Sequence, residues 1–272
     1  MSQKKVLFIS QEIYPYLEET NISTISRHLP QVIQDRGKEI RAFMPKYGNI
    51  NERRNQLHEV IRLSGMNLII DDNDHSLIIK VASIQPARMQ IYFIDNDDYF
   101  QNRETLVDAN GEEYDDNDER SIFFIRGVME TVKKLRWVPD IIHCHGWFSA
   151  LAPLYIKKGY ADEPCFRSAK VIYSLYDDSF GKAFRESFAR KLRFDGIGES
   201  EIKKIKKRGT IDYKNLTKLA VDFSDGIIQS CENADSEIIR YINEKEVKFL
   251  PYHSDFGKWA EDINTFYDEL HP

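Results

Sequence analysis

The fold of this 272-residue chain is most constrained by the segment Trp137 to Tyr155, which reads WVPDIIHCHGWFSALAPLY. A polar turn leads into the short apolar run Ile141-Ile142, and Gly146 then separates this run from an expected amphipathic helix. The apolar side of that helix is expected to hold Leu151, Leu154 and Tyr155. Strand, polar loop and helix in this order place side chains in the crevice at the carboxyl ends of a parallel sheet.

Two histidines end the predicted strand of this segment. His143 and His145 stand at i and i+2, so they share one face of the strand, while Cys144 points to the other face. We expect His143 to be a hydrogen-bonded core residue and His145 to stand at the crevice. A zinc site from the three residues is disfavoured because the thiol faces away from both rings.

The N-terminal residues predict a strand–helix–strand unit. Lys4–Ser10 is a continuous apolar run of the kind found in central parallel strands. Residues Ile22–Arg36 carry an apolar stripe at helical spacing, and Gly37 has the position of a glycine that ends a helix. A second strand is predicted over Ile40–Met44, joined by a right-handed crossover.

The remaining pattern completes an α/β domain, a Rossmann-like and mostly parallel sheet flanked by helices. Predicted strands are Met66–Ile70, Leu77–Ile84, Met89–Ile94, Val171–Tyr176 and Gly226–Ser230, and predicted helices are Arg120–Leu135, Tyr213–Phe223 and Asn233–Ile242. The turn residues 71–74 suggest a local hairpin grafted onto the main sheet, and residues 95–119 are acidic and loop-like. No repeat or flexible linker interrupts the pattern, so residues 1–272 are read as one domain.

Composition excludes several classes of function. The formal net charge is −6, which gives no global basic field for nucleic acid or an anionic membrane, and the basic run Lys203–Arg208 is read as a solvated helix face. No segment reaches the length of a membrane span or a signal peptide, and three cysteines without metal spacing suit a reduced compartment. A soluble, cytoplasmic protein is expected. The dinucleotide fingerprint and the phosphate-binding P-loop are both missing after the first strand.

A series of short motifs, in a constant order, resembles the N-terminal domain of bacterial glycogen and starch synthases. They are KVLFISQEIYP (5–15), Leu29-Pro30, MPKYG (44–48), YFID (92–95), Tyr99-Phe100, Asp116-Asn117 with Arg120, residues 137–155, and Asn215 with Lys218 and Asp225. Any one of these motifs is weakly specific. Their shared order along most of the chain is what makes the resemblance strong.

The resemblance implies one half of a GT-B fold, the acceptor side of a glucosyltransferase. Family members transfer glucose from ADP-glucose to an α-1,4-glucan with retention of configuration, and they need no metal or other cofactor. By the same resemblance, His145 matches an active-site histidine. Substrate-binding positions are implied at Glu12, Asn117, Arg120 and Trp147. The chain matches the N-terminal half of the family only, and the nucleotide-binding half has no counterpart in it.

The first loop departs from the family pattern. Where the family reads Lys-Thr-Gly-Gly-Leu, this chain has Glu18, Glu19, Thr20, Asn21 and Ile22. Glycines allow close backbone approach, and the family lysine would approach the donor's phosphates, so two glutamates here oppose donor binding. The polar residue after His145 is likewise replaced by Gly146.

Two acidic clusters have simpler interpretations than catalysis. The pair Glu18-Glu19 is read as a solvated loop rather than an acid–base dyad. The run Asp115–Glu119 lacks the spacing of a calcium loop and is expected to cap and charge-stabilise the start of the following helix.

The leading functional hypothesis is a degenerate, glycogen-synthase-like protein that binds glucan or a partner enzyme of glycogen metabolism, with homodimerisation as a further expectation. One alternative is an active subunit, completed by a separate chain that supplies the nucleotide-binding half. Another is a structural or regulatory protein that binds no carbohydrate. The tail 255–270 has an apolar face at helical spacing and resembles the crossover helix that ends GT-B enzymes.

Overall fold

The computed structural model describes residues 3–85 and 87–272. Its strands are β1 (Lys5–Ser10), β2 (Glu39–Pro45), β3 (His58–Glu59), β4 (Met66–Ile70), β5 (Asn73–Ile84), β6 (Met89–Asp95), β7 (Ile141–His145), β8 (Lys170–Leu175), β9 (Gly226–Gln229) and β10 (Lys248–Leu250). Its α-helices are α1 (Asn21–Asp35), α2 (Asn117–Leu135), α3 (Ala152–Leu154), α4 (Phe188–Lys191), α5 (Glu199–Lys206), α6 (Tyr213–Asp222), α7 (Ser236–Glu244) and α8 (Phe256–Leu270). Single turns of other helix types are η1 (Asp97–Gln101), η2 (Trp147–Ser149) and η3 (Tyr155–Gly159).

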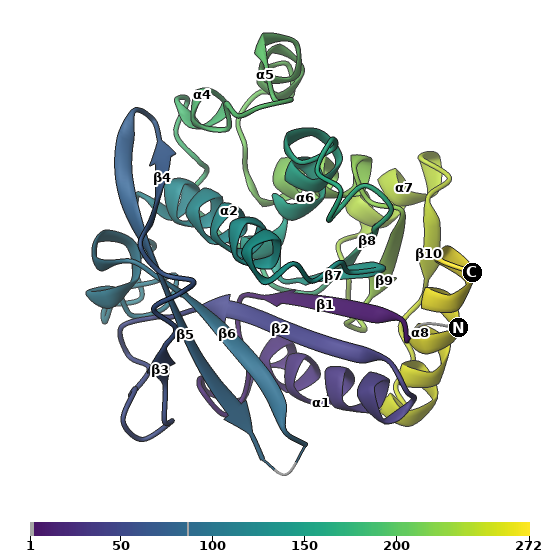
Figure 1. Cartoon of the computed structure of the whole chain (residues 1–272). Helices are drawn as coiled ribbons and strands as arrows, with labels where there is room; N and C mark the ends of the chain where they lie inside the picture. Colours follow the sequence, from purple (N-terminus) through teal and green to yellow (C-terminus); the bar gives the residue numbers. More distant parts are fainter. Residues whose placement is uncertain (1–2, 86) are drawn as a thin grey trace.

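The sheet has the strand order β10-β9-β8-β7-β1-β2-β6-β5-β3, with β4 paired to β5 at its edge (Figure 1). Every pairing from β10 to β6 is parallel, and β3, β4 and β5 pair antiparallel. This confirms the predicted Rossmann-like, mostly parallel sheet. Because β1 lies between β2 and β7, the chain reverses its direction of travel across the sheet at β1, and a crevice is expected at the carboxyl ends of β1 and β7.

The predicted N-terminal unit is present within one or two residues of its expected bounds. The Thr20 hydroxyl caps α1 by accepting the Ser23 backbone N–H, and the Thr20 backbone N–H donates in turn to the Ser23 hydroxyl oxygen. At the other end Gly37 adopts a φ of 87° and donates its N–H to Gln34, while the Lys38 N–H reaches Ile33. These two hydrogen bonds close the end of the helix in a geometry that favours glycine at position 37.

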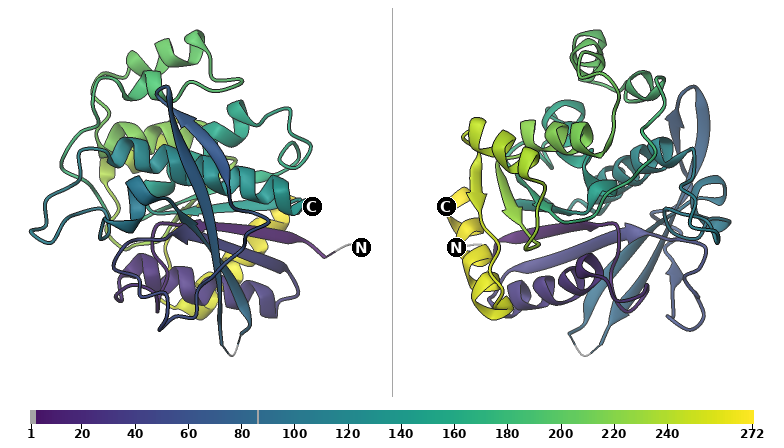
Figure 2. Two further views of the ribbon diagram at one scale, coloured as in Figure 1. Left: turned by 60° about the vertical axis from the view of Figure 1, so that its left-hand side comes forward. Right: turned by 180° about the vertical axis from the view of Figure 1, so that it is seen from behind.

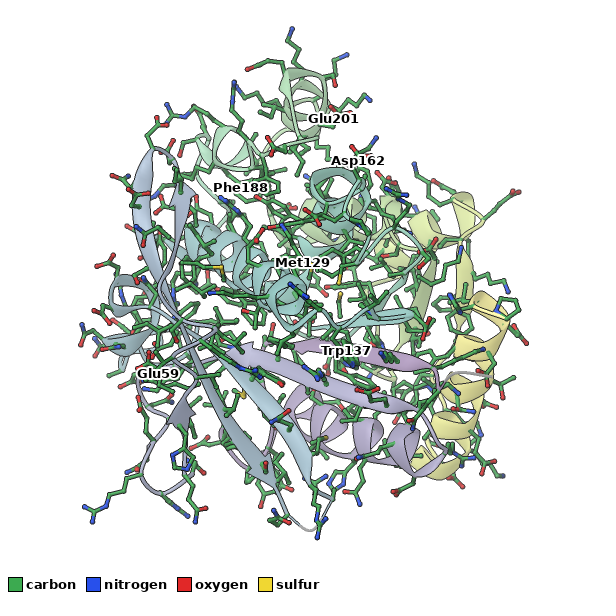
Figure 3. All side chains as sticks on the ribbon, viewed as in Figure 1. Glu59, Met129, Trp137, Asp162, Phe188 and Glu201 are labelled. Atoms are coloured by element: carbon green, nitrogen blue, oxygen red, sulfur yellow. The ribbon has the colours of Figure 1, made fainter. Side chains whose placement is uncertain are left out.

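Helices cover both faces of the sheet (Figure 2). α1 and α8 contact each other on one side, and α2, α6 and the short helical turns after β7 lie on the other. Figure 3 shows side chains filling the space between these layers, with Met129 on α2 among them. The predicted apolar residues of the tail are all buried in α8, namely Trp259, Ile263, Phe266, Tyr267 and Leu270.

One element differs from its prediction. Residues 147–159 do not form a single amphipathic helix but a 3₁₀ turn, one α turn and one π turn in succession. Pro153 lacks the amide that a regular helix would use there, and every residue from Trp147 to Ile156 is buried. Residues 147–156 are therefore covered on all sides, and the segment lies between the sheet and α6.

The antiparallel edge matches the expected hairpin. β4 and β5 are joined by Asp71 and Asp72, whose φ values are 47° and 66°. Positive φ at both central residues is the signature of the two-residue turn that suits the twist of a hairpin.

The charged stretch 181–210 holds two short helices, α4 and α5. In α5 the two isoleucines Ile202 and Ile205 are buried, whereas Lys203, Lys204 and Lys206 are exposed, as expected for a solvated basic face. Figure 3 marks Phe188 on α4, which contacts α2. Within this arm a helix was expected only for the basic run Lys203–Arg208, so α4 is the helix that the sequence did not predict.

Candidate functional site

A cavity of about 410 Å³ opens at the carboxyl ends of β1, β7 and β8, where the switch in strand order lies. We call it the strand-end cavity. It is lined by Gln11 and Glu12 after β1, residues 20–22 at the start of α1, the loop residues 105–107 and Glu113, Trp147 after β7, and residues 177–179 after β8. Its walls thus come from segments that are far apart in the sequence.

The turn between β7 and η2 is held against the end of β1. Gly146 has a φ of 81°, and a Cβ atom added there would lie 2.4 Å from the Gln11 side chain. Gln11 donates its backbone N–H to the His145 carbonyl at 3.2 Å, and its Oε1 accepts the Phe148 N–H at 3.2 Å. Only glycine fits this contact, which explains why a residue with a side chain is absent directly after His145.

Both strand histidines are fully buried. His143 bonds the Tyr267 hydroxyl through Nδ1 at 2.6 Å and the Ser174 hydroxyl through Nε2 at 2.7 Å, so it is the core residue that the sequence predicted. His145 bonds the Tyr176 hydroxyl through Nδ1 at 2.7 Å, and its Nε2 has no partner among the described residues. Burial lowers the pKa of His145 to about 3, so the ring is neutral.

His145 is fully buried and does not line the strand-end cavity, whereas Gln11 and Trp147 do. A role for His145 in binding a ligand therefore remains a prediction. In the described parts of the chain, no group of three or more His, Cys, Asp and Glu side chains could hold a metal ion.

Trp147 borders the strand-end cavity while remaining 97% buried, since only 3% of its surface is exposed. Its ring packs against Phe180, with centroids 4.6 Å apart, and more distantly against Phe184. Its backbone N–H donates to Oδ2 of Asp178 at 2.8 Å.

Asp178 is the site residue that sequence reasoning missed. Burial, with smaller contributions from Glu12 and Asp177, raises the pKa of its carboxyl to about 7. The residue as a whole is partly exposed, yet its Oδ1 is buried and has no partner in the described structure. The available signal was a pair of aspartates directly after an apolar strand, at the edge where crevices form.

Glu12 and the first loop meet at the cavity wall. The Thr20 hydroxyl donates to Oε2 of Glu12 at 2.6 Å, and Gln11 donates to its Oε1 at 3.1 Å. Asn21 donates from Nδ2 to the Ser230 carbonyl at 3.0 Å. Thr20 and Asn21 line the cavity, whereas the exposed Glu18 and Glu19 do not.

Asn117 and Arg120, predicted to bind substrate, are placed inside the protein. Arg120 is fully buried and donates to the carbonyls of Tyr99 and Thr105, both at 2.8 Å, and to the side chain of Asn117. Asn117 in turn donates to the Leu106 carbonyl at 2.8 Å. The structure does not bring Arg120 to the cavity; the two side chains instead hold the loop that supplies residues 105–107 to its wall.

The acidic run at the start of α2 meets its expectation in part, because Asp118 and Glu119 lie in the first turn, where negative charge stabilises a helix. Asp116 stands at the N-cap position but makes no side-chain cap bond, because its carboxylate pairs with Arg103 at 3.0 Å. Asp118 and Glu119 also bind the buried amine of Lys191 in α4, at 2.7 and 2.6 Å. The run therefore anchors the α4–α5 arm.

The strand-end cavity is acidic. Four of its lining side chains are carboxylates, Glu12, Glu113, Asp177 and Asp178, and none of the described residues that line it is Lys, Arg or His. Both oxygens of Glu113 accept backbone amides, those of Gly181 and Lys182, at 2.7 Å. A ligand of this cavity meets hydrogen-bond acceptors and no compensating positive charge.

The fold and the place of its crevice define one Rossmann-like half of a GT-B fold. The structure matches the catalytic domain of starch synthase IV from Arabidopsis thaliana, solved bound to ADP and acarbose, with a TM-score of 0.72 at 18% identity. That match covers 92% of this chain and 51% of the other. The family model of the starch synthase catalytic domain matches residues 5–248, and the chain belongs to this family.

Curated relatives agree with this assignment. The chain is 37% identical over 174 residues to glycogen synthase of Chlorobium limicola and 38% identical over 174 residues to that of Chlorobaculum tepidum. Each match covers 64% of this chain and 36% of the relative, so the matched part spans little more than a third of these enzymes. The resemblance drawn from the sequence motifs is confirmed. No helix in residues 3–85 or 87–272 has the length and apolar character that crossing a membrane requires.

Proposed function

We propose that this member of the starch synthase family binds α-1,4-glucan in the strand-end cavity and does not by itself use ADP-glucose as a glucosyl donor. The substrate class comes from the relatives, which are named glycogen synthases. The observation that carries the proposal is the charge of the cavity wall, which has four carboxylates and no cationic side chain.

Electrostatics separates the two ligand classes. Two unit charges about 4 Å apart interact by about 4 kcal/mol at an effective dielectric near 20, so a diphosphate beside several ionised carboxylates is strongly disfavoured. A glucan is uncharged, and its hydroxyl groups can donate hydrogen bonds to these same carboxylates. The acidic wall therefore suits the acceptor sugar and opposes the nucleotide donor.

The first loop supports the same conclusion. Glu18 occupies the place of the lysine in the resembled family pattern, and it is exposed beside Glu19. Thr20 is held as the cap of α1 and as a donor to Glu12, so it is not free to wrap around a phosphate. Each of these features removes a favourable contact for an anionic ligand.

The second candidate function is the acceptor half of an active transferase that is completed by a nucleotide-binding half. The observation that favours it is the structural match, which covers 92% of this chain but 51% of starch synthase IV. In that case the chain contributes the glucan site, and the donor's charge is neutralised by residues outside it.

Titration calorimetry with maltoheptaose and, separately, with ADP-glucose tests the proposal. We expect heat of binding for maltoheptaose only. Replacing Glu12 by alanine removes a charged hydrogen-bond acceptor from the cavity. Because a hydrogen bond to a charged group contributes about 1.5–3 kcal/mol, glucan binding should weaken by tenfold or more. The matched control is Glu18→Ala, which removes the same group outside the cavity lining and should leave affinity unchanged.

Three outcomes contradict the proposal. Binding of ADP-glucose, or incorporation of labelled glucose into glycogen by the pure chain, shows that the acidic wall does not exclude the donor. Equal loss of affinity in both variants shows that net charge, rather than the cavity, controls binding. Absence of glucan binding leaves a structural or regulatory protein as the better description.

A further inference from the structure

A second cavity, of about 240 Å³, lies between the first turns of α1 and the segment that joins β10 to α8. We call it the aromatic cavity; its main lining residues are Asn21, His28, Tyr252, His253, Phe256 and Trp259. α1 and α8 lie side by side on one face of the sheet (Figures 1 and 2). The cavity therefore stands at the same carboxyl edge of the sheet as the strand-end cavity, because α1 follows β1 and the joining segment follows β10.

Aromatic rings surround this cavity and stay open to solvent. Tyr252 and Phe256 are each 36% exposed, and their ring centroids lie 6.3 and 6.4 Å from that of Trp259. The His28 ring meets Phe256 edge-on, with centroids 6.4 Å apart. Three large aromatic side chains are exposed in the described chain, and two of them, Tyr252 and Phe256, line the aromatic cavity. Open aromatic faces around a concave surface mark a binding site more often than scattered ones do.

The polar side chains of the aromatic cavity include two histidines, His28 and His253, beside Asn21 and the Trp259 indole. Its lining holds no Asp, Glu, Lys or Arg among the described residues, in contrast to the strand-end cavity. Trp259 is 1% exposed, and its indole N–H has no hydrogen-bond partner in the described structure. Apolar ring faces together with polar groups that include no carboxylate, lysine or arginine suit a sugar ring, which has an apolar face and a rim of hydroxyls.

Asn21 connects the two cavities because its side chain lines both. Its bond to the Ser230 carbonyl holds it in place at the boundary. We propose that the aromatic cavity is a second saccharide subsite, which stacks a ring of the same glucan chain on Tyr252 or Phe256 while the strand-end cavity holds another part of that chain. This inference rests on the proposed glucan binding, and it adds a subsite that favours longer glucans.

The test compares a short and a long glucan. Calorimetry is carried out with maltose and with maltoheptaose on the wild type, on the double variant Tyr252→Ala/Phe256→Ala, and on the control Tyr14→Ala. Tyr14 is 39% exposed and lines neither cavity. We expect the double variant to bind maltoheptaose about tenfold more weakly, because two ring contacts are lost. Its affinity for maltose should stay within twofold of that of the wild type. The control should match the wild type for both ligands.

A second measurement places the ligand directly. The chain has three tryptophans, and the difference in emission between the wild type and Trp259→Phe reports on the indole of the aromatic cavity. Maltoheptaose should change this difference, and the additional Tyr252→Ala/Phe256→Ala changes should abolish that response. Circular dichroism on every variant confirms that it is folded.

The outcomes distinguish this inference from the proposal beneath it. Wild-type binding of maltoheptaose with unchanged affinity in the double variant overturns the subsite alone. Equal loss for maltose and maltoheptaose overturns it as well, because the changes then act on the strand-end cavity. Conversion of a dimer into a monomer by the double variant assigns the aromatic cavity to a contact between copies of the chain. No wild-type binding of either glucan overturns both proposals.

Discussion

A buried ion-pair cluster helps to attach the α4–α5 arm to the body of the protein, and replacing Lys191 by methionine tests how much that cluster contributes. The Lys191 amine lies 2.7 Å from Asp118 and 2.6 Å from Glu119, with 2% of its side chain exposed and 1% of that of Asp118. Burial raises the pKa of Asp118, and the hydrogen bond from Lys191 opposes that rise. Without the amine, the aspartate is left buried and uncompensated.

Removing one partner of a buried pair in this way costs about 3–5 kcal/mol. We therefore expect Lys191→Met to lower the free energy of unfolding by that amount at pH 8, measured by urea denaturation followed by circular dichroism. The pKa of Asp118 rises further once Lys191 is gone, so the carboxyl takes up a proton as the pH falls. The loss should consequently shrink at pH 5, where the unpaired negative charge is partly neutralised.

The neighbouring Arg190 provides the matched control. It pairs with Asp71 at 2.9 Å, but 62% of its side chain is exposed, so Arg190→Met should cost less than about 1 kcal/mol. Adding Asp118→Asn to the Lys191 variant should recover part of the loss at pH 8. The reasoning is refuted if the two single variants lose equal stability, or if the loss in Lys191→Met is the same at both pH values.

Three further changes probe the crevice and the core. A carboxyl whose pKa is raised in the folded state lowers the free energy of unfolding as the pH rises, for Asp178 between about 4 and 7. We therefore expect Asp178→Asn to stabilise the protein by about 2–4 kcal/mol at pH 8 and by less at pH 5, measured by urea unfolding. Gly146→Ala forces a Cβ against Gln11 at positive φ and should cost at least about 2 kcal/mol; an unchanged melting temperature would contradict this. Tyr267→Phe leaves Nδ1 of the buried His143 unpaired and should cost about 1–3 kcal/mol, again by urea unfolding, whereas Tyr14→Phe should cost nothing measurable.

Local patterns predicted the regular elements well. The expected strand Lys4–Ser10, helix Ile22–Arg36 and strand Ile40–Met44 correspond to β1, α1 and β2 with bounds shifted by one or two residues. Apolar runs and helical spacing are properties of neighbouring residues, so they can be read without knowledge of distant contacts. The order of the family motifs carried the assignment in the same way.

The irregular elements could not be predicted so well. The broken helical segment 147–159 depends on Pro153 and on burial from all sides, and the edge strand β10 is three residues long. The helices of the α4–α5 arm pack on α2 through Lys191, whose partner Asp118 lies 73 positions away. Contacts at such separation leave no periodic signal in either segment.

The candidate site was predicted only in part. Glu12, Thr20, Asn21 and Trp147 line the strand-end cavity, whereas Arg120 lies in the interior. The prediction that Arg120 binds substrate followed from the family resemblance, which does not show the contacts of the residue. Its role in holding the carbonyls of Tyr99 and Thr105 is visible only once the loop is folded over it.

The sequence by itself determined the family, the parallel sheet and the chemical types of the side chains that follow each strand. Those features depend on local composition and spacing, which survive without any tertiary contact. The tertiary structure alone decided that His145 is covered, that Asp178 carries an unpaired buried oxygen, and that Asn21 separates an acidic cavity from an aromatic one. The burial of a side chain and its hydrogen-bond partners depend on contacts between distant segments, so they are set by how the elements pack and not by any one stretch of the chain.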